Sequence, residues 1–406
     1  EVRDPSGSVI AGADVKAVNK GTGAERATTT NDAGLYNFPN LQPGAYEVTV
    51  SKSGFQTMTR TDLTLQVQQV ARVDFAMQIG QTTQTVEVTG ATALLTTENA
   101  TVGSVIENKR IVELPLNGRN FLQLVSLAPN VSSGFNDNST AGARQGGARA
   151  GQNISVAGQR SEFNHFTLDG VENTDPVYNT FVFLPSIDAL QEFKVQTGIY
   201  PAEFGRAIAQ VNVSTKSGTN AYHGALFEFL RNEKLDAKNY FFGATPSNLR
   251  VKDPFKWNQF GFALGGPLSI PKLYDAKNRL FFFSNYEGYR DRKQLRGVFN
   301  VPTAAMRAGD FRGLPVIYDP ATRVQTGSVV KAQPFPNNII PSQRFDPIAL
   351  KLFEFLPEQN VFGGTGFAGT RQDGLRRVID KDQFTQRIDF VESANSNWYG
   401  RYSWGS

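Results

Sequence analysis

Cysteine is absent from all 406 residues of the chain. The chain therefore forms no disulfide, offers no thiolate to a metal and has no cysteine nucleophile. Histidine is nearly absent as well, because only His165 and His223 occur. So few imidazoles argue against a histidine-rich metal centre and against histidine-based acid–base chemistry. We predict that the protein is not an enzyme and that it holds no cofactor and no metal.

Long apolar runs and blocks of like charge are missing too. No stretch reaches the roughly 18 apolar residues that predict a membrane-spanning helix. The net charge is only +4 and the Lys and Arg residues are scattered, which argues against a nucleic-acid partner. No signal peptide is present, but the chain opens on Glu1 within what we expect to be a strand, so we expect further sequence before it.

Glycine and phenylalanine, by contrast, are plentiful, with 38 and 31 residues. This composition favours strands and tight turns over bundles of helices. A length of 406 residues predicts two or three domains. We predict a mainly β protein with domains at residues 1–80, 81–220 and 221–406.

Residues 1–80 predict a small β-sandwich. Turn sequences such as DPSG at residues 4–7 and NDAG at 31–34 separate short alternating segments, and about seven strands at this spacing fit a sandwich. The string GLYNFPNLQPGAYEVTVSKSGFQT at residues 34–57 resembles the carboxypeptidase regulatory-like domain, which has a transthyretin-like fold. That module is not itself catalytic, and we interpret it as a structural spacer rather than a binding module.

Residues 81–220 are rich in small residues and predict an α+β domain. A helix is expected from Phe121, because Phe121, Leu124 and Val125 share one helical face and a proline ends the pattern. Residues 132–152 are rich in Gly, Ala, Ser and Asn and are expected to be mobile, either as plain disorder or as a loop that meets a ligand. Short strands are expected at ISVAG, HFTLDGV, QEFKVQTG and AQVNVSTKSG.

From residue 221 onward, five segments alternate in the manner of strands between lipid and water. In one of them, Phe260 and Phe262 oppose Gln259. Each segment is near the roughly 9–11 residues that cross a bilayer as a tilted strand. The connections run long, short, very long and short, which is typical of outer-membrane barrels, and we expect residues 290–383 to be a very long structureless loop. The five segments lie at residues 221–230, 257–268, 279–289, 384–390 and 397–405.

Several long motifs resemble the plug domain of TonB-dependent outer-membrane receptors. They are NFLQLVSLAPNV, SVAGQRSEFNHFTLDGVENTDP and SIDALQEFKVQTGIYPAEFGRAIAQVNVSTKSGTN. LPLNGRNF together with the N-terminal sandwich indicates the Oar-like subgroup, and WNQFGFALGGPL and FFFSNYEGYR resemble its first barrel strands. The resemblance implies a Gram-negative outer-membrane receptor whose plugged barrel takes up a ligand with energy delivered through TonB. The implied fold is a transthyretin-like β-sandwich, an α+β plug domain and a partial antiparallel transmembrane β-barrel. The implied partners are TonB on the periplasmic side, outer-membrane lipid, and an extracellular ligand such as a siderophore, glycan or peptide.

The segment QTTQTVEVTG resembles the TonB box, the short stretch that TonB grips by adding it to a sheet edge. Pairing of this kind needs backbone groups, strand propensity and the absence of proline more than particular side chains. The alternative is an ordinary linker strand. The residues assigned to this partner-binding segment are Thr85, Val86, Glu87, Val88 and Thr89.

A second group of candidate residues lies in the plug motifs. Glu203, Gly205 and Arg206 belong to the sequence EFGR, and the resemblance implies that charges here hold the plug to the barrel wall. The alternative is that these charges are solvated. Asp169 and Gly170 are interpreted as a turn between two plug strands and not as a catalytic acid.

Five strands are too few for a single-chain barrel, which needs at least about eight. We therefore expect that the partner of the last strand, NWYGRYSWGS, lies in sequence beyond this chain, which would make the chain a fragment. Two other functions stay open at this point. One is an Oar-like outer-membrane adhesion or protein-export component. The other is a secreted, soluble, β-rich glycan-binding protein.

Overall fold

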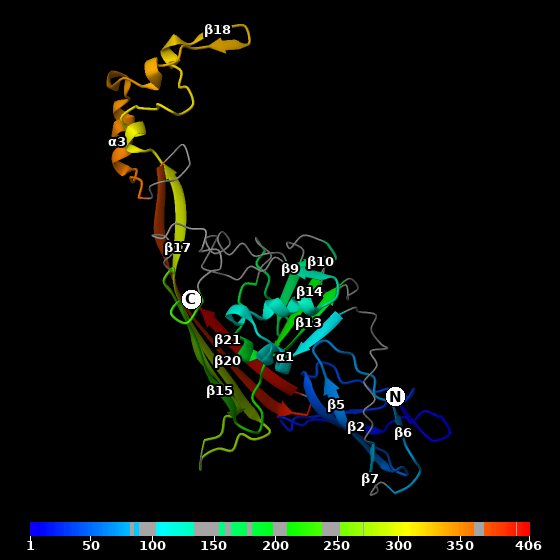
Figure 1. Cartoon of the computed structure of the whole chain (residues 1–406). Helices are drawn as coiled ribbons and strands as arrows, with labels where there is room; N and C mark the ends of the chain where they lie inside the picture. Colours follow the sequence, from blue (N-terminus) through cyan, green and yellow to red (C-terminus); the bar gives the residue numbers. More distant parts are fainter. Residues whose placement is uncertain are drawn as a thin grey trace. The chain divides into compact units, whose positions relative to one another are not determined.

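The computed structural model is dominated by β-strands, as the sequence predicts (Figure 1). The chain divides into two compact units. The larger unit comprises Glu1–Phe229, Asn258–Arg290 and Ile379–Ser406, and the smaller comprises Leu230–Trp257 and Asp291–Val378. The structure describes residues 1–81, 85–88, 103–133, 154–158, 164–176, 181–197, 209–237, 252–270, 272–360, 369–394 and 396–406.

The N-terminal domain consists of two sheets around one core. Its larger sheet has the strand order β3-β2-β4-β5-β7, and its smaller sheet pairs β1 with β6. Val2 of β1, Val50 of β4 and Phe75 of β6 belong to the same buried cluster, so the predicted sandwich is confirmed. The strands are β1 Val2–Arg3, β2 Asp14–Asn19, β3 Glu25–Thr29, β4 Gly44–Ser51, β5 Thr57–Leu65, β6 Phe75–Ala76 and β7 Thr85–Val88.

The middle domain is built on a second five-stranded sheet, with the order β12-β11-β14-β13-β8. The central strand β14 is buried along its whole length, and it pairs with β11 and β13 at its two edges. All four strands expected from the sequence are present. The elements of this domain are β8 Gly103–Glu107, α1 Asn108–Glu113, η1 Asn117–Arg119, η2 Phe121–Leu127, β9 Val131–Ser133, β10 Ile154–Val156, β11 Asn164–Leu168, β12 Val171–Glu172, η5 Ile187–Ala189, β13 Leu190–Thr197 and β14 Ala209–Thr215.

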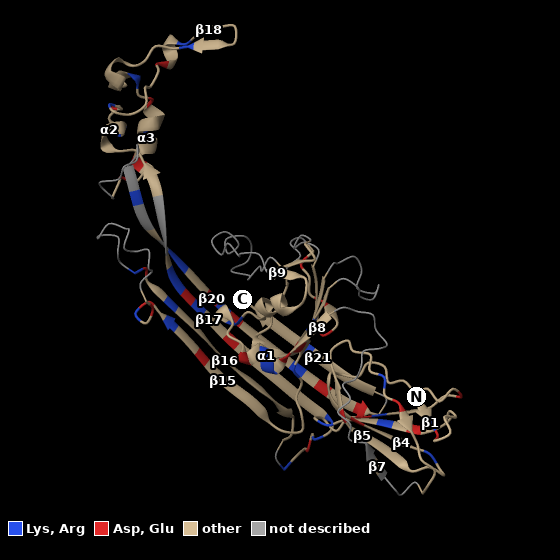
Figure 2. Ribbon diagram, turned by 45° about the vertical axis from the view of Figure 1, so that its right-hand side comes forward, with Lys and Arg blue, Asp and Glu red and all other residues tan. Residues whose placement is uncertain are grey.

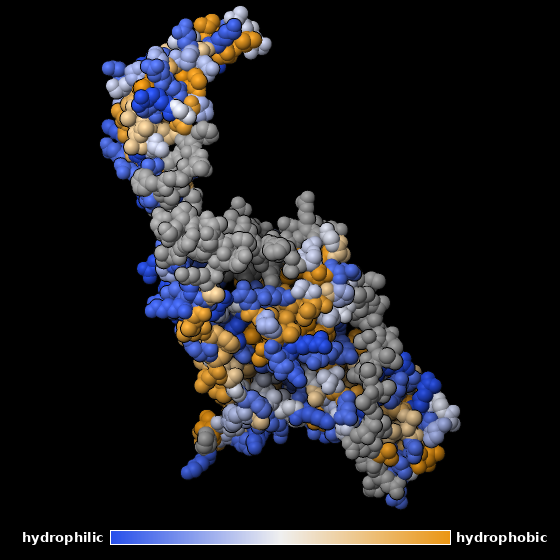
Figure 3. All heavy atoms as spheres, in the orientation of Figure 1, coloured by the Kyte–Doolittle hydropathy of each residue, from blue (hydrophilic) through white to orange (hydrophobic). Residues whose placement is uncertain are grey.

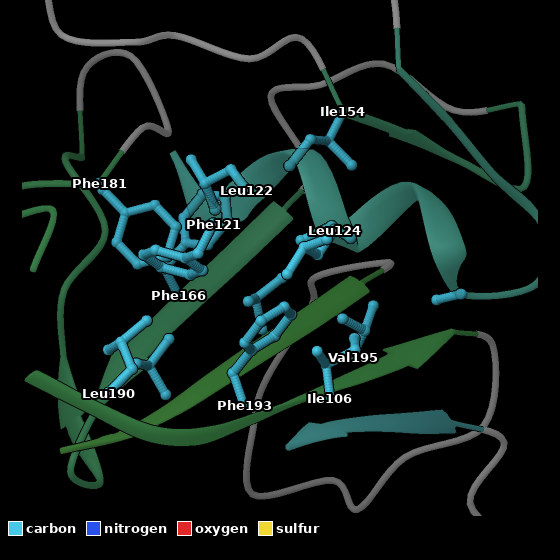
Figure 4. Close-up of a cluster of buried hydrophobic side chains, with 14 of the residues drawn as sticks. Ile106, Phe121, Leu122, Leu124, Ile154, Phe166, Phe181, Leu190, Phe193 and Val195 are labelled. Atoms are coloured by element: carbon cyan, nitrogen blue, oxygen red, sulfur yellow. The ribbon is translucent and has the colours of Figure 1, made fainter. Parts of the chain in front are cut away.

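The predicted helix from Phe121 is present, but it is a 3-10 helix rather than an α-helix. The Asn120 side chain caps it by accepting a hydrogen bond from the Leu122 amide, and the residues up to Pro129 leave room for only two turns of the tighter form. The predicted apolar face is confirmed, since Phe121, Leu124 and Val125 are buried. Figure 4 shows Phe121 and Leu124 packed between the helix and the sheet, with Phe166, Phe181 and Phe193 beside them.

The remaining strands form a third five-stranded sheet, the barrel sheet, with the order β15-β16-β17-β20-β21. The strands are β15 His223–Asn232, β16 Phe255–Pro267, β17 Leu280–Val301, β20 Gly369–Ser393 and β21 Ser396–Gly405. β20 and β21 pair antiparallel, and Phe384 lies opposite Trp404. All five predicted strands are therefore present. Among the described residues, no helix combines the length and hydropathy that a membrane-spanning helix requires.

The expectation of a structureless loop at residues 290–383 is wrong. β17 and β20 extend to 22 and 25 residues, because ion pairs continue between them beyond the apolar alternation. Arg290 lies 2.8 Å from Asp382, and Arg377 lies 2.6 Å from Asp291. The sequence between the two strands also contains short elements, namely α2 Ala304–Arg307, η9 Pro320–Thr322, β18 Val324–Thr326, β19 Val329–Lys331, η10 Pro336–Asn338, η11 Ser342–Arg344 and α3 Pro347–Phe355. Charged residues interrupt the apolar alternation by which a strand is recognised in the sequence, but they leave its backbone hydrogen bonds intact.

Candidate functional site

The barrel sheet has two chemically different faces. Its inner face, which contacts the middle domain, buries polar and charged side chains, and Figure 2 shows acidic and basic residues recurring along β17 and β20. Its outer face carries exposed apolar and aromatic side chains. β15 carries apolar side chains on both faces, and Figure 3 shows apolar side chains gathered where this strand runs. On β21, Trp398 and Tyr402 are each 65% exposed on the outer face, while Arg401 points inward. The buried polar residues of the inner face are Gln259, Asn285, Glu287, Thr385, Arg387 and Asp389.

One cluster of charges joins the middle domain to β20 and β21. Asp169 follows β11 and has a positive φ of 51°, and Gly170 follows with a φ of 79°, so the predicted Asp-Gly turn is present. The Asp169 carboxylate accepts hydrogen bonds from the Thr215 amide at 2.8 Å and from the Thr215 hydroxyl at 2.7 Å. These two bonds fix the carboxylate at the end of the neighbouring strand β14. We call Asp169, Arg387, Asp389 and Arg401 the Asp169 cluster.

The partners of Asp169 on the barrel sheet are two arginines. Arg401 Nε lies 2.9 Å from Asp169 Oδ2, and Arg387 Nη1 lies 3.7 Å from Asp169 Oδ1. Arg387 also donates from Nε and Nη2 to Asp389, at 2.9 and 2.8 Å. The cluster thus holds two cations and two carboxylates. Its side chains are only 5% to 15% exposed.

Main-chain contacts strengthen the same junction. The Tyr399 hydroxyl donates to the Asp169 carbonyl at 3.1 Å, and Arg401 donates to the Leu168 carbonyl at 3.4 Å. The Arg387 guanidinium lies 4.7 Å from the centre of the Tyr399 ring, which is a cation–π distance. The turn is therefore held through its backbone as well as through its charge.

A second cluster joins the middle domain to β15, β16 and β17. Arg119 pairs with Asp188 within the middle domain, and its Nε lies 3.8 Å from Glu287 of β17. Glu287 accepts 2.6 Å hydrogen bonds from the hydroxyl of Ser186 and from the amide of Gln259. We call Arg119, Ser186, Asp188, Gln259 and Glu287 the Arg119 cluster.

Aromatic rings complete the environment of Arg119. Its guanidinium carbon lies 4.2 Å from the centre of the Phe227 ring and 4.7 Å from that of Phe229. Both rings come from β15, on the face of that strand that points toward the middle domain. Lys216 lies in the segment after β14, where burial lowers the pKa of its ammonium group and the Asp188 carboxylate opposes that effect.

Buried charge clusters of this kind fix the position of a domain more than they increase the free energy of unfolding. A buried ion pair often adds little to the free energy of folding, but removing one partner costs about 3–5 kcal/mol because the other charge stays buried and unpaired. The two clusters therefore define one docked position for the middle domain. Sliding the domain along the sheet would separate buried charges in a medium of low dielectric constant.

The structure brings together only some of the residues proposed from the sequence. Asp169 and Gly170 lie in the Asp169 cluster, while Glu203, Gly205 and Arg206 fall outside the described residues. Thr85, Val86, Glu87 and Val88 form β7 of the N-terminal domain, and Thr89 falls outside the described residues. The loop expected at residues 132–152 also lies outside them, apart from its first two residues in β9.

Sequence reasoning missed the partners that the barrel sheet supplies. Arg387 and Asp389 alternate with Phe384, Ile388 and Phe390, so a charge pair on the polar side of a barrel strand was the available signal. Arg119 stands in the NGRN sequence before the 3-10 helix, where its positive φ of 53° marks a local turn. In the part of the chain that is described, no group of three or more His, Cys, Asp or Glu side chains forms a metal site.

Family models match the N-terminal domain and the part of the chain that contains the barrel sheet. Residues 1–78 match the carboxypeptidase regulatory-like domain, and residues 214–406 match the outer membrane beta barrel domain. The chain thus combines a carboxypeptidase regulatory-like domain with strands of an outer-membrane β-barrel, and it is a protein of the outer membrane.

Comparison with curated proteins gives the particular relationship. The chain is a homologue of the TonB-dependent transporter Oar of Myxococcus xanthus, with 26% identity over 304 residues. The match covers 72% of this chain and 27% of that protein, so the chain spans about a quarter of the length of its relative. The relative is a transporter rather than an enzyme.

Solved structures of siderophore receptors are also similar to the chain. The siderophore receptor PirA from Pseudomonas aeruginosa is 14% identical, over 76% of this chain and 41% of its own, with a TM-score of 0.33. The ferric enterobactin receptor PfeA from the same organism, in complex with BCV-L6, is 15% identical, over 76% of this chain and 33% of its own, with a TM-score of 0.35.

Proposed function

We propose that this chain belongs to a TonB-dependent transporter in which the middle domain plugs an outer-membrane barrel and TonB supplies the work of opening it. The observation that carries the proposal is the inner face of the barrel sheet. Asp169 of the middle domain lies beside two sheet-borne arginines, of which only Arg387 also pairs with a carboxylate of the sheet, Asp389. A sheet with this charge on one face and exposed aromatic rings on the other fits a barrel wall between a plug and lipid.

Opening such a barrel requires work. The two clusters hold the middle domain by buried charges, and thermal motion alone separates such charges rarely. A pulling partner in the periplasm would provide the work if it gripped an extended segment of the chain. Thr85–Val88 supports this role, because it is an extended, proline-free strand that precedes the middle domain.

The ligand would be a molecule such as a siderophore, a glycan or a peptide. The described part of the chain favours none of the three. TonB-independent binding to a surface would instead favour an adhesion role for the same barrel.

The absence of cysteine offers a direct test in intact cells. We would introduce Val86→Cys in the candidate TonB box and pair it with single cysteines in the periplasmic domain of TonB. Disulfide-linked receptor–TonB adducts on non-reducing gels are the expected result. Ile79→Cys, whose parent side chain is 76% exposed in the same domain, is the matched control. Adduct yields at Val86→Cys no higher than at Ile79→Cys would contradict the proposal.

A further inference from the structure

The candidate TonB box is already part of a sheet. β7 pairs in parallel with β5 of the N-terminal domain, and the register partners are Thr57–Thr85, Met58–Val86, Thr59–Glu87 and Arg60–Val88. β5 pairs with β4 along its other edge. β7 is thus the terminal strand of the order β3-β2-β4-β5-β7.

A terminal strand uses only half of its backbone groups within its own sheet. Its outward N–H and C=O groups form an edge to which another strand can add. Among the described residues, β7 has no neighbour on that outer side. The N-terminal domain thereby holds Thr85–Val88 in an extended conformation, with an outer edge to which no other described strand pairs.

We propose that the N-terminal domain presents Thr85–Val88 to TonB as a preformed edge strand, so that TonB extends the N-terminal sheet instead of gripping a free peptide. This inference rests on the proposed function. Its physical basis is pre-organisation, because ordering one residue of a free peptide costs about 1–2 kcal/mol of conformational entropy. Docking on β5 removes much of that cost before TonB arrives.

β5, the strand that pairs with β7, leads into a turn that contacts the middle domain. The turn at residues 66–69 directly follows β5 and is closed by a 2.9 Å hydrogen bond from the Gln66 amide to the Gln69 side chain. From β13 of the middle domain, Glu192 accepts a hydrogen bond from the Val67 amide, and Lys194 donates to the Gln68 carbonyl at 3.1 Å. Force applied to β7 therefore reaches β13 through β5 and this turn.

A reversible disulfide tests the proposal without removing any domain. Met58 and Val86 are register partners, so Met58→Cys with Val86→Cys introduces the only two thiols among these 406 residues and locks β7 onto β5 when oxidised. We would measure the Kd of the purified periplasmic domain of TonB for the detergent-solubilised receptor, oxidised and after reduction. The two single-cysteine variants control for the substitutions.

Presentation of the docked strand predicts that the oxidised lock binds TonB with a Kd no more than about threefold weaker than that of the reduced form. A larger weakening, reversed by reduction, would overturn the proposal, because TonB would then need the segment to leave β5. Absence of TonB binding by the reduced form and by both single variants would contradict the proposed function itself. The two failures are therefore distinguishable.

Discussion

Arg387 of β20 and Arg401 of β21 are direct register partners on the inner face of the barrel sheet. Like charges placed directly opposite each other destabilise a strand pair. Asp389 neutralises one of these guanidinium groups from within the sheet, and Asp169 of the middle domain lies 2.9 Å from the other. The sheet is thus electrostatically complete only when the middle domain is docked against it.

Asp169→Asn should loosen that docking. The asparagine oxygen can still accept from Thr215, but Arg401 would lose the carboxylate beside it while Arg387 keeps Asp389, and an uncompensated buried charge costs about 3–5 kcal/mol. We expect a corresponding loss of hydrogen-exchange protection at the Thr215 amide, which now donates to Asp169.

The control for this variant is Asp310→Asn. Asp310 pairs with Arg312 in the smaller unit, and the Arg312 side chain is 68% exposed, so solvent screens that pair. Unchanged protection of Thr215 is expected there. Unchanged protection in Asp169→Asn would show that the Asp169 cluster does not hold the middle domain.

Arg119 and Glu287 should respond very differently to neutral substitutions. Arg119 lies beside two buried carboxylates, Asp188 and Glu287. Arg119→Met removes the guanidinium group that lies beside both carboxylates and should cost about 3–5 kcal/mol in the free energy of unfolding. Glu287→Gln removes one of two like charges and keeps polar groups for Ser186 and Gln259, so it should cost less than about 1 kcal/mol.

Chemical denaturation of the two variants in detergent would measure this difference. Arg26, which lies outside both clusters, provides the reference variant Arg26→Met. Equal losses in Arg119→Met and Glu287→Gln would mean that the cluster acts by packing and not by charge balance.

The sequence predicted most of the fold because the relevant signals are local. Alternation identified all five barrel strands, and turn residues marked the limits of strands in the N-terminal domain. The lengths of β17 and β20 escaped this reasoning, because ion pairs such as Arg377 with Asp291 interrupt the apolar alternation while backbone pairing continues. The helix at Phe121 was located correctly, but its type depends on a cap and a two-turn length that periodicity does not resolve.

The site was less predictable for a physical reason. Asp169 was recognised as a turn residue, which it is, but its partners Arg387 and Arg401 lie more than two hundred residues away in the chain. Charge complementarity between two sheets becomes visible only when both are folded. The assignments of Glu203 and Arg206 as plug-to-wall charges and of residues 85–89 as the TonB box stay predictions, as do the three domain boundaries.

The contact between the N-terminal and middle domains should weaken as the pH rises. Burial raises the pKa of the Glu192 carboxyl group. The hydrogen bond from the Val67 amide opposes this shift, and the nearby Glu107 carboxylate adds to it. Burial also lowers the pKa of the neighbouring Lys194. Because the folded state favours the protonated carboxyl group, the contribution of Glu192 is complete below the ordinary glutamate pKa of about 4.3. It is lost as the pH rises through the raised pKa.

Glu192→Gln should remove this dependence. The amide oxygen can still accept from Val67, and no proton is bound or released. The opening free energy of the Val67 amide, obtained from hydrogen exchange corrected for intrinsic rates, should fall between pH 4 and pH 8 in the native protein and stay level in the variant. Glu113→Gln, at an exposed position of α1, should retain the native slope. A level native profile would contradict the prediction.

Tyr402 provides the test of the lipid-facing assignment. It is 65% exposed on the outer face of β21, and its inward neighbour Arg401 contacts the middle domain. An arginine facing lipid near the bilayer midplane costs about 2–4 kcal/mol, so Tyr402→Arg should reduce the fraction of receptor that folds into lipid vesicles. The heat-modifiable band on unboiled gels measures that fraction. Val330→Arg replaces an exposed residue of β19 in the smaller unit and should fold like the native protein. Equal folded fractions for both variants would mean that the aromatic face of β21 is covered by protein rather than by lipid.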